Sequence, residues 1–404
     1  MTAVAGTSLR RVGLNLLYLV PGAVGGSEVY ARELVGALGR ARPELELIAF
    51  ANDEGASSLA QAGWPANVRI VRLPVRGANK PARIATELTR LPVAARRHGV
   101  ELLHSLGTTG PVVVPGIPHV LSILDLIYAH YPDTFPTAAR LGLHAVVGPA
   151  ARRADRVVTI SEAVKRDVVA RLRVPAERVE AVLLGYGAAA SNTAPAPPEA
   201  VRSRFGIGDG RVVLCVSAAL AHKNLHQLVD AFAALGPGFE DCRLVLVGHH
   251  GREAQALRAH AEQAGVGERV VQTGWIESGE LEGLYALATC CAYPSLHEGF
   301  GMPPLEAMVR DVPLACSNAT SLPEVTGKAA ELFDPRDVDA MRAAIARLLT
   351  EEARRAELVV RGRERVALFT WERCAQGVLA AYGRCRADGY TSAATSAGRQ
   401  PFRP

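Results

Sequence analysis

The sequence predicts two α/β domains, each built around a doubly wound parallel sheet, which face a central cleft. Three observations support this prediction. Short apolar runs of strand length alternate with helical patterns in both halves of the chain. The stretch AAASNTAPAPPEA (188–200) has no periodicity and is rich in proline, as in an interdomain linker. At 404 residues the chain is also too long for one ordinary core.

In the first half, β-rich runs alternate with amphipathic segments. A helix is predicted at 27–40, where Tyr30, Leu34 and Leu38 form one stripe. Another is predicted at 161–172, where Ser161 is a suitable N-cap. The predicted strands are 12–20, 45–50, 68–73, 119–126 and 156–160.

The second half repeats this scheme with continuously apolar runs, which are typical of parallel strands buried on both faces. The segment 369–382 is an amphipathic helix, and from residue 388 the chain turns small and polar, which predicts a disordered tail. The predicted strands are 211–218, 243–248, 269–274, 289–295 and 312–318. The resulting division is a first domain at 1–187, a linker at 188–200, a second domain at 201–370, a terminal helix at 371–387 and a tail at 388–404.

The composition argues against nucleic acid as a partner. The formal net charge is +5, the arginines are spread along both halves, and aromatic residues make up 5%. The basic region at 76–97 is denser, and two interpretations stay open. It docks on an anionic membrane surface or an acidic acceptor, or it is a solvated helix face.

The seven cysteines include no CxxC pair, which indicates a reduced, cytoplasmic protein, with peripheral contact at the inner membrane face as a further expectation. The opening stretch SLRRVGLNLLYLVPGAVGGS (8–27) resembles a signal peptide, but its apolar run is short and contains Asn15, so a first buried strand fits it better. No apolar stretch has the roughly 20 residues of a spanning helix.

Two motifs lie where a doubly wound sheet binds anions. Gly25 and Gly26 follow the first predicted strand and open the first helix, so that the backbone can approach an anion at a helix N-terminus. Lys223 stands just before a helix and can reach a phosphate oxygen. Taken alone, each motif has an ordinary alternative, a strand–helix turn for the glycines and a surface lysine for Lys223.

The stretch LHEGFGMPPLEAM (296–308) carries two glutamates eight residues apart. Pro303 and Pro304 suit the first turn of a helix, which would place Glu306 in that turn, at the positive end of the helix dipole. Glu298 lies on the preceding glycine-containing loop, whose backbone N–H groups can face a ligand. A helix cap with an unused glutamate is the structural alternative.

Taken together, these motifs resemble the retaining glycosyltransferases of the group often called group 1 or family 4, which have the GT-B fold. The residues that carry the resemblance span about 12–385. They are Gly25-Gly26-Ser27-Glu28, His222-Lys223-Asn224-Leu225, Gly274-Trp275-Ile276, Glu298-GFGMPPL-Glu306, VTISEAVKRDV (158–168), LPEVTG (322–327) and FTWERCA (369–375).

The resemblance implies metal-independent transfer of a hexosyl unit from a UDP- or GDP-linked sugar to a hydroxyl of an acceptor, with no cofactor. The acceptor would be a glycan, a glycolipid or a small-molecule aglycone. Glu306 would hold the ribose, Lys223 the diphosphate, and Glu298 the sugar. Glu298, Lys223 and Asp125 would lie closest to the chemistry. The implied donor-binding residues are Gly25, Gly26, Lys223, Gly274, Trp275, Ile276, Glu298, Gly299, Phe300, Gly301, Met302 and Glu306.

The chain departs from this family pattern at three positions, one of which is Leu220, where an acidic residue is frequent. Ala218 stands where many members carry an arginine, and Leu124 replaces the histidine of a His-Asp pair. Asp125 remains an acceptor-side candidate, with His130 and His104 as substitutes for the missing histidine. The alternatives are another enzyme of the same fold, such as a sugar-nucleotide epimerase or a disaccharide synthase or phosphorylase, or an inactive binding subunit.

Two further patterns resemble metal sites but have simpler explanations. Asp337 and Asp339 form an Asp-x-Asp sequence at the start of a predicted helix, where capping is the expected role. His249 and His250 have no third ligand at suitable spacing, so no metal site is predicted.

Overall fold

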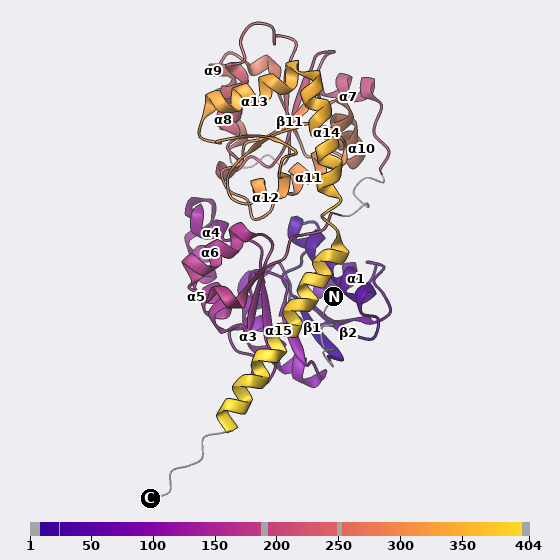
Figure 1. Cartoon of the computed structure of the whole chain (residues 1–404), viewed down its shortest axis with the longest axis vertical. Coiled ribbons are helices and arrows are strands. Elements are labelled where there is room, and N and C mark those ends of the chain that lie inside the picture. The colour runs from indigo at the N-terminus through magenta and orange to yellow at the C-terminus, as the bar shows by residue number, and fades with distance from the viewer. Residues whose placement is uncertain (1–8, 24, 187–192, 249–252, 398–404) are drawn as a thin grey trace, which may run out of the picture. The chain divides into compact units, whose positions relative to one another are not determined.

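The computed structural model describes residues 9–23, 25–186, 193–248 and 253–397, with side chains described as far as residue 385. The chain forms two compact units (Figure 1). The first unit comprises Met1–Leu126, Pro136–Gly185 and Thr370–Pro404, and the second comprises Ile127–Phe135 and Tyr186–Phe369.

The first unit contains a seven-stranded sheet in the order β3-β2-β1-β4-β5-β6-β7, and every neighbouring pair is parallel. Strand β1 is central, so that Val12 pairs with Leu47 on one side and Leu102 on the other. The strands are β1 (Arg11–Leu16), β2 (Glu46–Ala51), β3 (Val68–Arg72), β4 (Leu102–Ser105), β5 (His119–Ile123), β6 (Arg156–Thr159) and β7 (Val179–Ala181).

Helices cover both faces of this sheet. Leu91 and Ala95 of α3 pack on one face against Leu17 and Leu103. Helices α1 and α15 pack against each other, and Tyr30 of α1 reaches the sheet through its hydroxyl, 2.8 Å from Ser122 Oγ. The helices are α1 (Gly26–Ala41), α2 (Asp53–Leu59), α3 (Lys80–Arg97), α5 (Thr137–Arg153), α6 (Glu162–Leu172), the 3₁₀ turn Ala176–Arg178 and α15 (Trp371–Ala397).

The second unit contains a six-stranded parallel sheet in the order β10-β9-β8-β11-β12-β13. Because side chains alternate along a strand, Val213 and Cys215 enter one core while Val212 and Leu214 enter another on the opposite face. The strands are β8 (Val212–Val216), β9 (Arg243–Val247), β10 (Val270–Gly274), β11 (Cys290–Tyr293), β12 (Leu314–Ser317) and β13 (Glu331–Phe333).

The helices of the second unit divide between the two faces. Helices α8, α9, α13 and α14 contribute to the core with Val213, and α7, α10 and α11 to the core with Val212. The bounds are α4 (Ile127–His130), α7 (Pro198–Phe205), α8 (Leu225–Ala233), α9 (Ala254–Gln263), α10 (Ser278–Leu287), α11 (Met302–Val309), α12 (Leu322–Thr326), α13 (Val338–Thr350), α14 (Glu352–Val366) and the 3₁₀ turns Pro132–Thr134, Ala221–Lys223 and Gly267–Arg269.

The ten predicted strands all form, and two predicted caps are confirmed. Ser161 Oγ accepts the N–H of Val164 at 3.1 Å, and Asp337 accepts the N–H of Ala340 at 2.9 Å. Three strands escaped prediction. β4 has only two apolar residues before His104 and Ser105, and β7 and β13 are three-residue edge strands that contain a glutamate.

Several boundaries differ from the sequence prediction. Helix α7 begins at Pro198, inside the predicted linker, because proline is well suited to the first turn of a helix. Helix α15 runs to Ala397, beyond the predicted end at 387, through a segment rich in alanine. The segment 127–135 groups with the second unit by its contacts. Residues 187–192 of the linker, His249-His250 and the tail from 398 lie outside the described residues.

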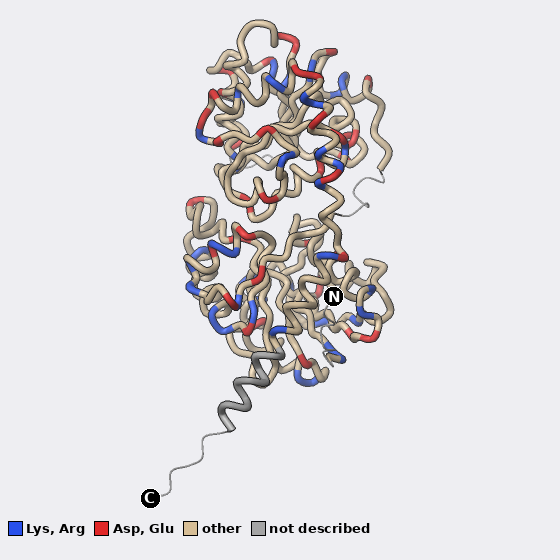
Figure 2. Tube along the Cα trace, in the orientation of Figure 1, with Lys and Arg blue, Asp and Glu red and all other residues tan. Residues whose placement is uncertain are grey.

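Charges of both signs alternate along the described part of each unit (Figure 2). Among the described residues, no helix combines the length and the apolar character needed to cross a membrane.

Candidate functional site

Two site residues predicted from separate motifs meet at the carboxyl edge of the second sheet. Lys223 follows β8 and Glu298 follows β11, and these strands are neighbours although 75 positions separate the two residues. The strand order reverses direction at this pair, and ligands of open α/β sheets bind in the crevice at such a switch point. The fold therefore places Lys223 and Glu298 where a ligand is expected.

Lys223, Glu298 and Tyr293 form one buried polar cluster. Lys223 Nζ lies 2.6 Å from Glu298 Oε1 and 3.2 Å from the Tyr293 hydroxyl, which itself donates to Glu298 Oε1 at 2.6 Å. The side chains of Lys223 and Glu298 are 16% and 10% exposed. Burial alone would raise the pKa of Glu298, but the ammonium group and the hydroxyl outweigh it and hold that pKa below its usual value. Glu298 is therefore ionised and oriented before any ligand arrives.

The loops that carry this cluster are held by their own hydrogen bonds. Asn224, with a left-handed φ of 61°, ends the 3₁₀ turn of Lys223 and donates to the carbonyls of Pro294 and Pro335. The N–H of Glu298 donates to Thr320 Oγ1 at 3.0 Å, and Ser321 Oγ donates to the carbonyls of Glu298 and Phe300. These bonds fix the backbone around Glu298, as a binding site requires.

Gly301 is required by the turn that starts helix α11. Its φ is +119°, and a Cβ atom there would come within 2.8 Å of Leu322 Cδ2. The turn lets the helix begin at Met302, so Glu306 is its fifth residue and lies outside the first turn. The prediction that Glu306 occupies the first turn is therefore wrong, since the proline pair occupies the second and third positions. The helix dipole consequently contributes less to Glu306 than expected.

Glu306 lies in a separate polar environment one helix turn from Arg310. The Tyr285 hydroxyl donates to Glu306 Oε2 at 3.1 Å. Arg310 pairs with Glu282, bonds the Tyr186 hydroxyl at 3.1 Å and lies over the Tyr285 ring. Burial raises the pKa of Glu306, an effect that the Arg310 charge only partly offsets. Because each carboxylate oxygen can accept more than one hydrogen bond, Glu306 can still accept from a ligand hydroxyl.

The Gly274-Trp275-Ile276 segment lies at the carboxyl edge of the same sheet. Gly274 lines a small cavity with Ser217, Gly248 and Gln272, at the ends of β8, β9 and β10. Trp275 is 75% exposed, so its ring can be reached by a flat ligand. Ile276 is instead buried in the core with Val212. Of these two side chains, only that of Trp275 is open to flank a base as predicted.

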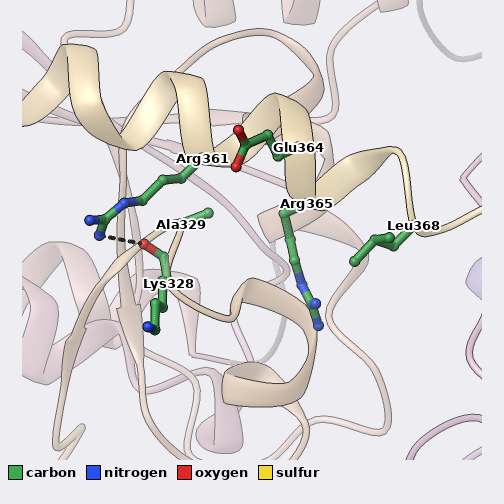
Figure 3. A pocket seen from close by; sticks show the side chains of 6 residues that line it. All are labelled: Lys328, Ala329, Arg361, Glu364, Arg365 and Leu368. Atoms are coloured by element: carbon green, nitrogen blue, oxygen red, sulfur yellow. Dashed lines mark hydrogen bonds between the residues drawn. The ribbon is translucent and has the colours of Figure 1, made fainter.

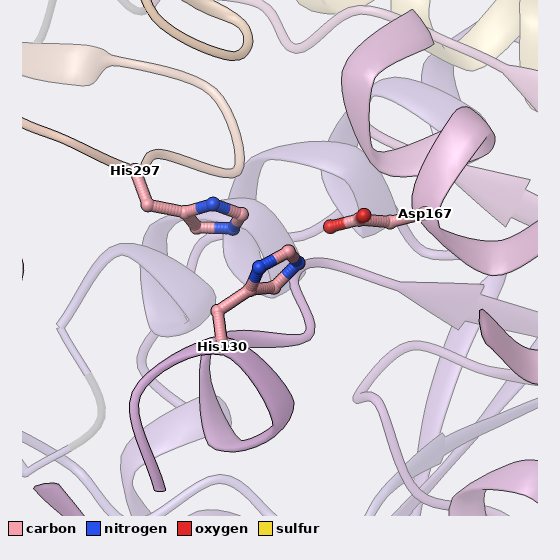
Figure 4. A group of neighbouring side chains, drawn as sticks. All are labelled: His130, Asp167 and His297. Carbon is pink, nitrogen blue, oxygen red and sulfur yellow. The ribbon is translucent and has the colours of Figure 1, made fainter. Parts of the chain in front are cut away.

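A group of rings adjoins Glu298, and its members other than His130 were not anticipated. The rings of His130 and His297 have centroids 4.1 Å apart (Figure 4), and Tyr131 lies near His222 and His297. Asp167, also labelled in the figure, belongs to α6 of the first unit. Burial, then the Lys223 charge, lowers the pKa of His222 to about 4, so its ring is neutral at pH 7.

Tyr293 and Tyr285 are site residues that sequence reasoning missed. Tyr293 stands at the end of an apolar run that reads as a core strand, and Tyr285 occupies a buried stripe of α10. Only the presence of a hydroxyl in such a run could have marked them, because a buried tyrosine hydroxyl needs a partner.

In the first unit, Gly25 is the N-cap of α1 with φ +53°, and a Cβ atom on Gly25 or Gly26 would meet nothing within 4 Å. Open space beside this backbone is what close approach of a ligand needs. Asp125 is half-buried two residues beyond the end of β5, also at a carboxyl edge.

His104 does not have the surroundings of an acceptor-side group. It is fully buried, with Nδ1 2.8 Å from the Tyr382 hydroxyl and Nε2 2.8 Å from Ser122 Oγ. Burial lowers its pKa to about 3. His104 therefore joins β4 to β5 and α15 as a neutral core residue.

A pocket of about 290 Å³ lies away from these residues, between α14 and the turn that follows α12 (Figure 3). Its arginines already have partners. Arg361 pairs with Glu357 and bonds the carbonyl of Lys328, and Arg365 donates to the carbonyls of Glu324 and Val325. These arginines thus hold α14 to the end of α12, and the pocket carries no cluster suited to catalysis.

Comparisons with known proteins show which families and structures the chain resembles. A family model described as Glycosyl transferases group 1 matches residues 198–365, and one described as Glycosyltransferase Family 4 matches residues 24–186. O-antigen chain mannosyltransferase B of Escherichia coli is 32% identical over 57% of this chain and 60% of its own length. A serotype-specific mannosyltransferase WbdA of Escherichia coli is 28% identical, and the match spans 29% of its length.

A relative that aligns over most of its length is a GDP-mannose-dependent α-(1-6)-phosphatidylinositol monomannoside mannosyltransferase of Mycolicibacterium smegmatis. It is 28% identical over 86% of this chain and 91% of its own. Among solved structures, Anabaena HepE with UDP and glucose has a TM-score of 0.68 at 20% identity, over 92% of this chain and 98% of its own. Sucrose-phosphate synthase from Thermosynechococcus elongatus has a TM-score of 0.70 at 22% identity, over 94% and 100%.

The structural matches show the fold. The two family models match parts of both units, and Lys223 and Glu298 lie within the residues matched by the group 1 model. Together the two family models match most of the chain, which belongs to the group 1 glycosyltransferases and has the GT-B fold.

Proposed function

We propose that this enzyme transfers a mannosyl unit from GDP-mannose to a hydroxyl of a carbohydrate acceptor, with retention at the anomeric carbon. The observation that carries the proposal is the Lys223–Glu298–Tyr293 cluster at the switch point of the second sheet. The relatives named mannosyltransferases, one of them GDP-mannose-dependent, support this donor among nucleotide sugars.

Each member of the site has a chemical task in this proposal. The Lys223 ammonium turns from Glu298 to the leaving diphosphate, where it offsets the charge that develops as the glycosidic bond breaks. Glu298, held ionised, accepts hydrogen bonds from hydroxyls of the transferred sugar. Glu306 accepts from the ribose hydroxyls, and the exposed ring of Trp275 stacks on the guanine base. The positive charge comes from Lys223 and backbone N–H groups, so we expect activity to survive EDTA.

Membrane contact belongs to the same proposal. On α3, Arg90 and Arg97 are exposed, and Val93 between them is 48% exposed. An exposed apolar residue flanked by arginines suits the surface of an anionic bilayer. A lipid-linked acceptor could be reached from such a position.

The proposal is tested by following nucleotide release from GDP-mannose, GDP-glucose, UDP-glucose and UDP-galactose with methyl α-D-mannopyranoside as acceptor. We expect GDP-mannose to be turned over fastest, and NMR of the product to show an α-linkage. Preference for a UDP-sugar would overturn the donor assignment, and a β-linked product would overturn retention. If Glu306→Ala leaves donor binding and turnover intact, the site assignment is wrong.

A further inference from the structure

A carboxylate stands on the buried stripe of α3, where an apolar side chain would be expected. Glu87 lies one turn before Leu91 and two before Ala95, which pack on the first sheet. Its side chain is 0% exposed, and neither carboxylate oxygen has a hydrogen-bond partner within the described residues. Burial raises the pKa of Glu87, and the Arg83 charge and then the neighbouring Thr109 hydroxyl oppose that effect. An unsatisfied buried carboxylate is costly, so its presence calls for an explanation.

Arg83, one turn earlier on the same helix, is also incompletely paired. Its Nε lies 3.7 Å from Glu87 Oε1, too far for a hydrogen bond, and has no partner in the described part of the chain. The Arg83 side chain is 12% exposed and so reaches the surface, unlike Glu87. The pair therefore leaves one N–H donor and two carboxylate oxygens for groups from outside the protein.

The pair lies near the switch point of the first sheet. Strand order in the first sheet reverses between β1 and β4, and the N-terminal half of α3 is at the carboxyl edge of that sheet. Tyr18 follows β1, and its ring packs against Gly107 after β4, where a Cβ atom would come within 2.6 Å. Burial and then the charge of Glu28 raise the pKa of Tyr18; the Glu87 charge adds to this effect and the Arg83 charge opposes it. Three segments thus converge on the switch point of this sheet.

We propose that Arg83 and Glu87 bind hydroxyl groups of a neutral carbohydrate, which is the acceptor if the proposed transfer holds. A hydroxyl can donate to Glu87 and accept from Arg83 at the same time. Adjacent hydroxyls of a sugar ring supply both functions, whereas a phosphate would be repelled by the carboxylate. The sugar approaches over Arg83, whose long side chain rotates towards the surface and uncovers Glu87.

The experiment measures binding of methyl α-D-mannopyranoside, methyl α-D-glucopyranoside and methyl α-D-galactopyranoside by saturation-transfer NMR and calorimetry. The proteins are the full chain and its Arg83→Gln, Glu87→Gln and Arg90→Gln variants. Arg90→Gln is the matched control, because it removes the same charge from the same helix at an exposed position. We expect at least one sugar to bind the wild type and the control equally, and each pair variant to bind it about fivefold or more weakly. GDP-mannose binding, which depends on the second unit, should be unchanged in all variants.

Failure of this inference and failure of the proposed function give different results. The inference is overturned if no sugar binds the wild type, if both pair variants bind sugar as the wild type does, or if inorganic phosphate displaces the sugar. If both pair variants bind sugar as the wild type does, Arg83 and Glu87 hold bound water instead. If inorganic phosphate displaces the sugar, the site binds anions. If sugars bind as expected but GDP-mannose does not bind, the donor proposal fails while this site stands. Thermal unfolding without ligand shows whether each variant is folded. If Glu87→Gln does not fold, sugar binding by Arg83→Gln alone tests the inference.

Discussion

Removing Lys223 tests the electrostatics of the site most directly. In Lys223→Met, Glu298 keeps the Tyr293 hydroxyl but loses the ion pair with Lys223, while its side chain remains only 10% exposed. Removing one partner of a buried pair costs about 3–5 kcal/mol, and the residual exposure here places the loss near the lower end, about 3 kcal/mol. For a unit of this size, that loss corresponds to a fall in Tm of about 6–12 °C.

The pH dependence follows from the pKa of Glu298. In the wild type that pKa is lowered, so the ion pair stabilises the folded protein at pH values above the ordinary pKa of a glutamate. This contribution to stability is lost as the pH falls through the pKa of the folded state. Without Lys223, burial raises the pKa, and the penalty for the charged form disappears as pH falls. The gap in Tm between wild type and variant should therefore narrow from about pH 8 to about pH 5.

Calorimetry or urea unfolding across this pH range provides the measurement. Adding Glu298→Gln to Lys223→Met removes the uncompensated charge and should restore stability to within about 1 kcal/mol of the wild type. Turnover of GDP-mannose by Lys223→Met should fall about 10²–10³-fold, because the developing diphosphate charge loses its partner. A Tm gap that is the same at both ends of the pH range, or a double variant no more stable than the single one, would refute the reasoning.

Four further outcomes are expected. Gly301→Ala should lower the free energy of unfolding by about 2 kcal/mol, because φ is +119° and the new Cβ meets Leu322. Gly206→Ala, at φ +63° in open space, should lower it less, and equal losses of stability in the two variants would contradict this reasoning. Glu306→Gln should weaken GDP-mannose binding about tenfold without lowering Tm, since burial, which raises the pKa of Glu306, already penalises its charged form in the free protein; a large fall in Tm would mean a structural role. Trp275→Ala should leave Tm unchanged and weaken GDP binding about tenfold by calorimetry; unaltered affinity would exclude stacking. Arg90→Glu with Arg97→Glu should reduce cosedimentation with phosphatidylglycerol vesicles about tenfold or more at low salt, while binding that is insensitive to both would exclude this face of α3.

Local sequence patterns carried much of the fold. Strand runs such as 211–218 and 243–248 and the caps at Ser161 and Asp337 depend on neighbouring residues, so they could be predicted one segment at a time. The strands that escaped, β4 and β13, are short and contain polar or charged residues, and their burial is decided by what packs on them.

The functional residues divide in the same way. The sequence by itself determined the two α/β halves and the motif residues Lys223, Glu298 and Glu306, because glycine, proline and charge at fixed spacing have local consequences. Only the tertiary structure decided that Lys223 meets Glu298 and Tyr293, that His104 is a core residue, and that Glu87 lies buried beside Arg83. The physical reason is that strand order and helix packing set both burial and long-range contacts, and neither can be read from the spacing of residues along one chain.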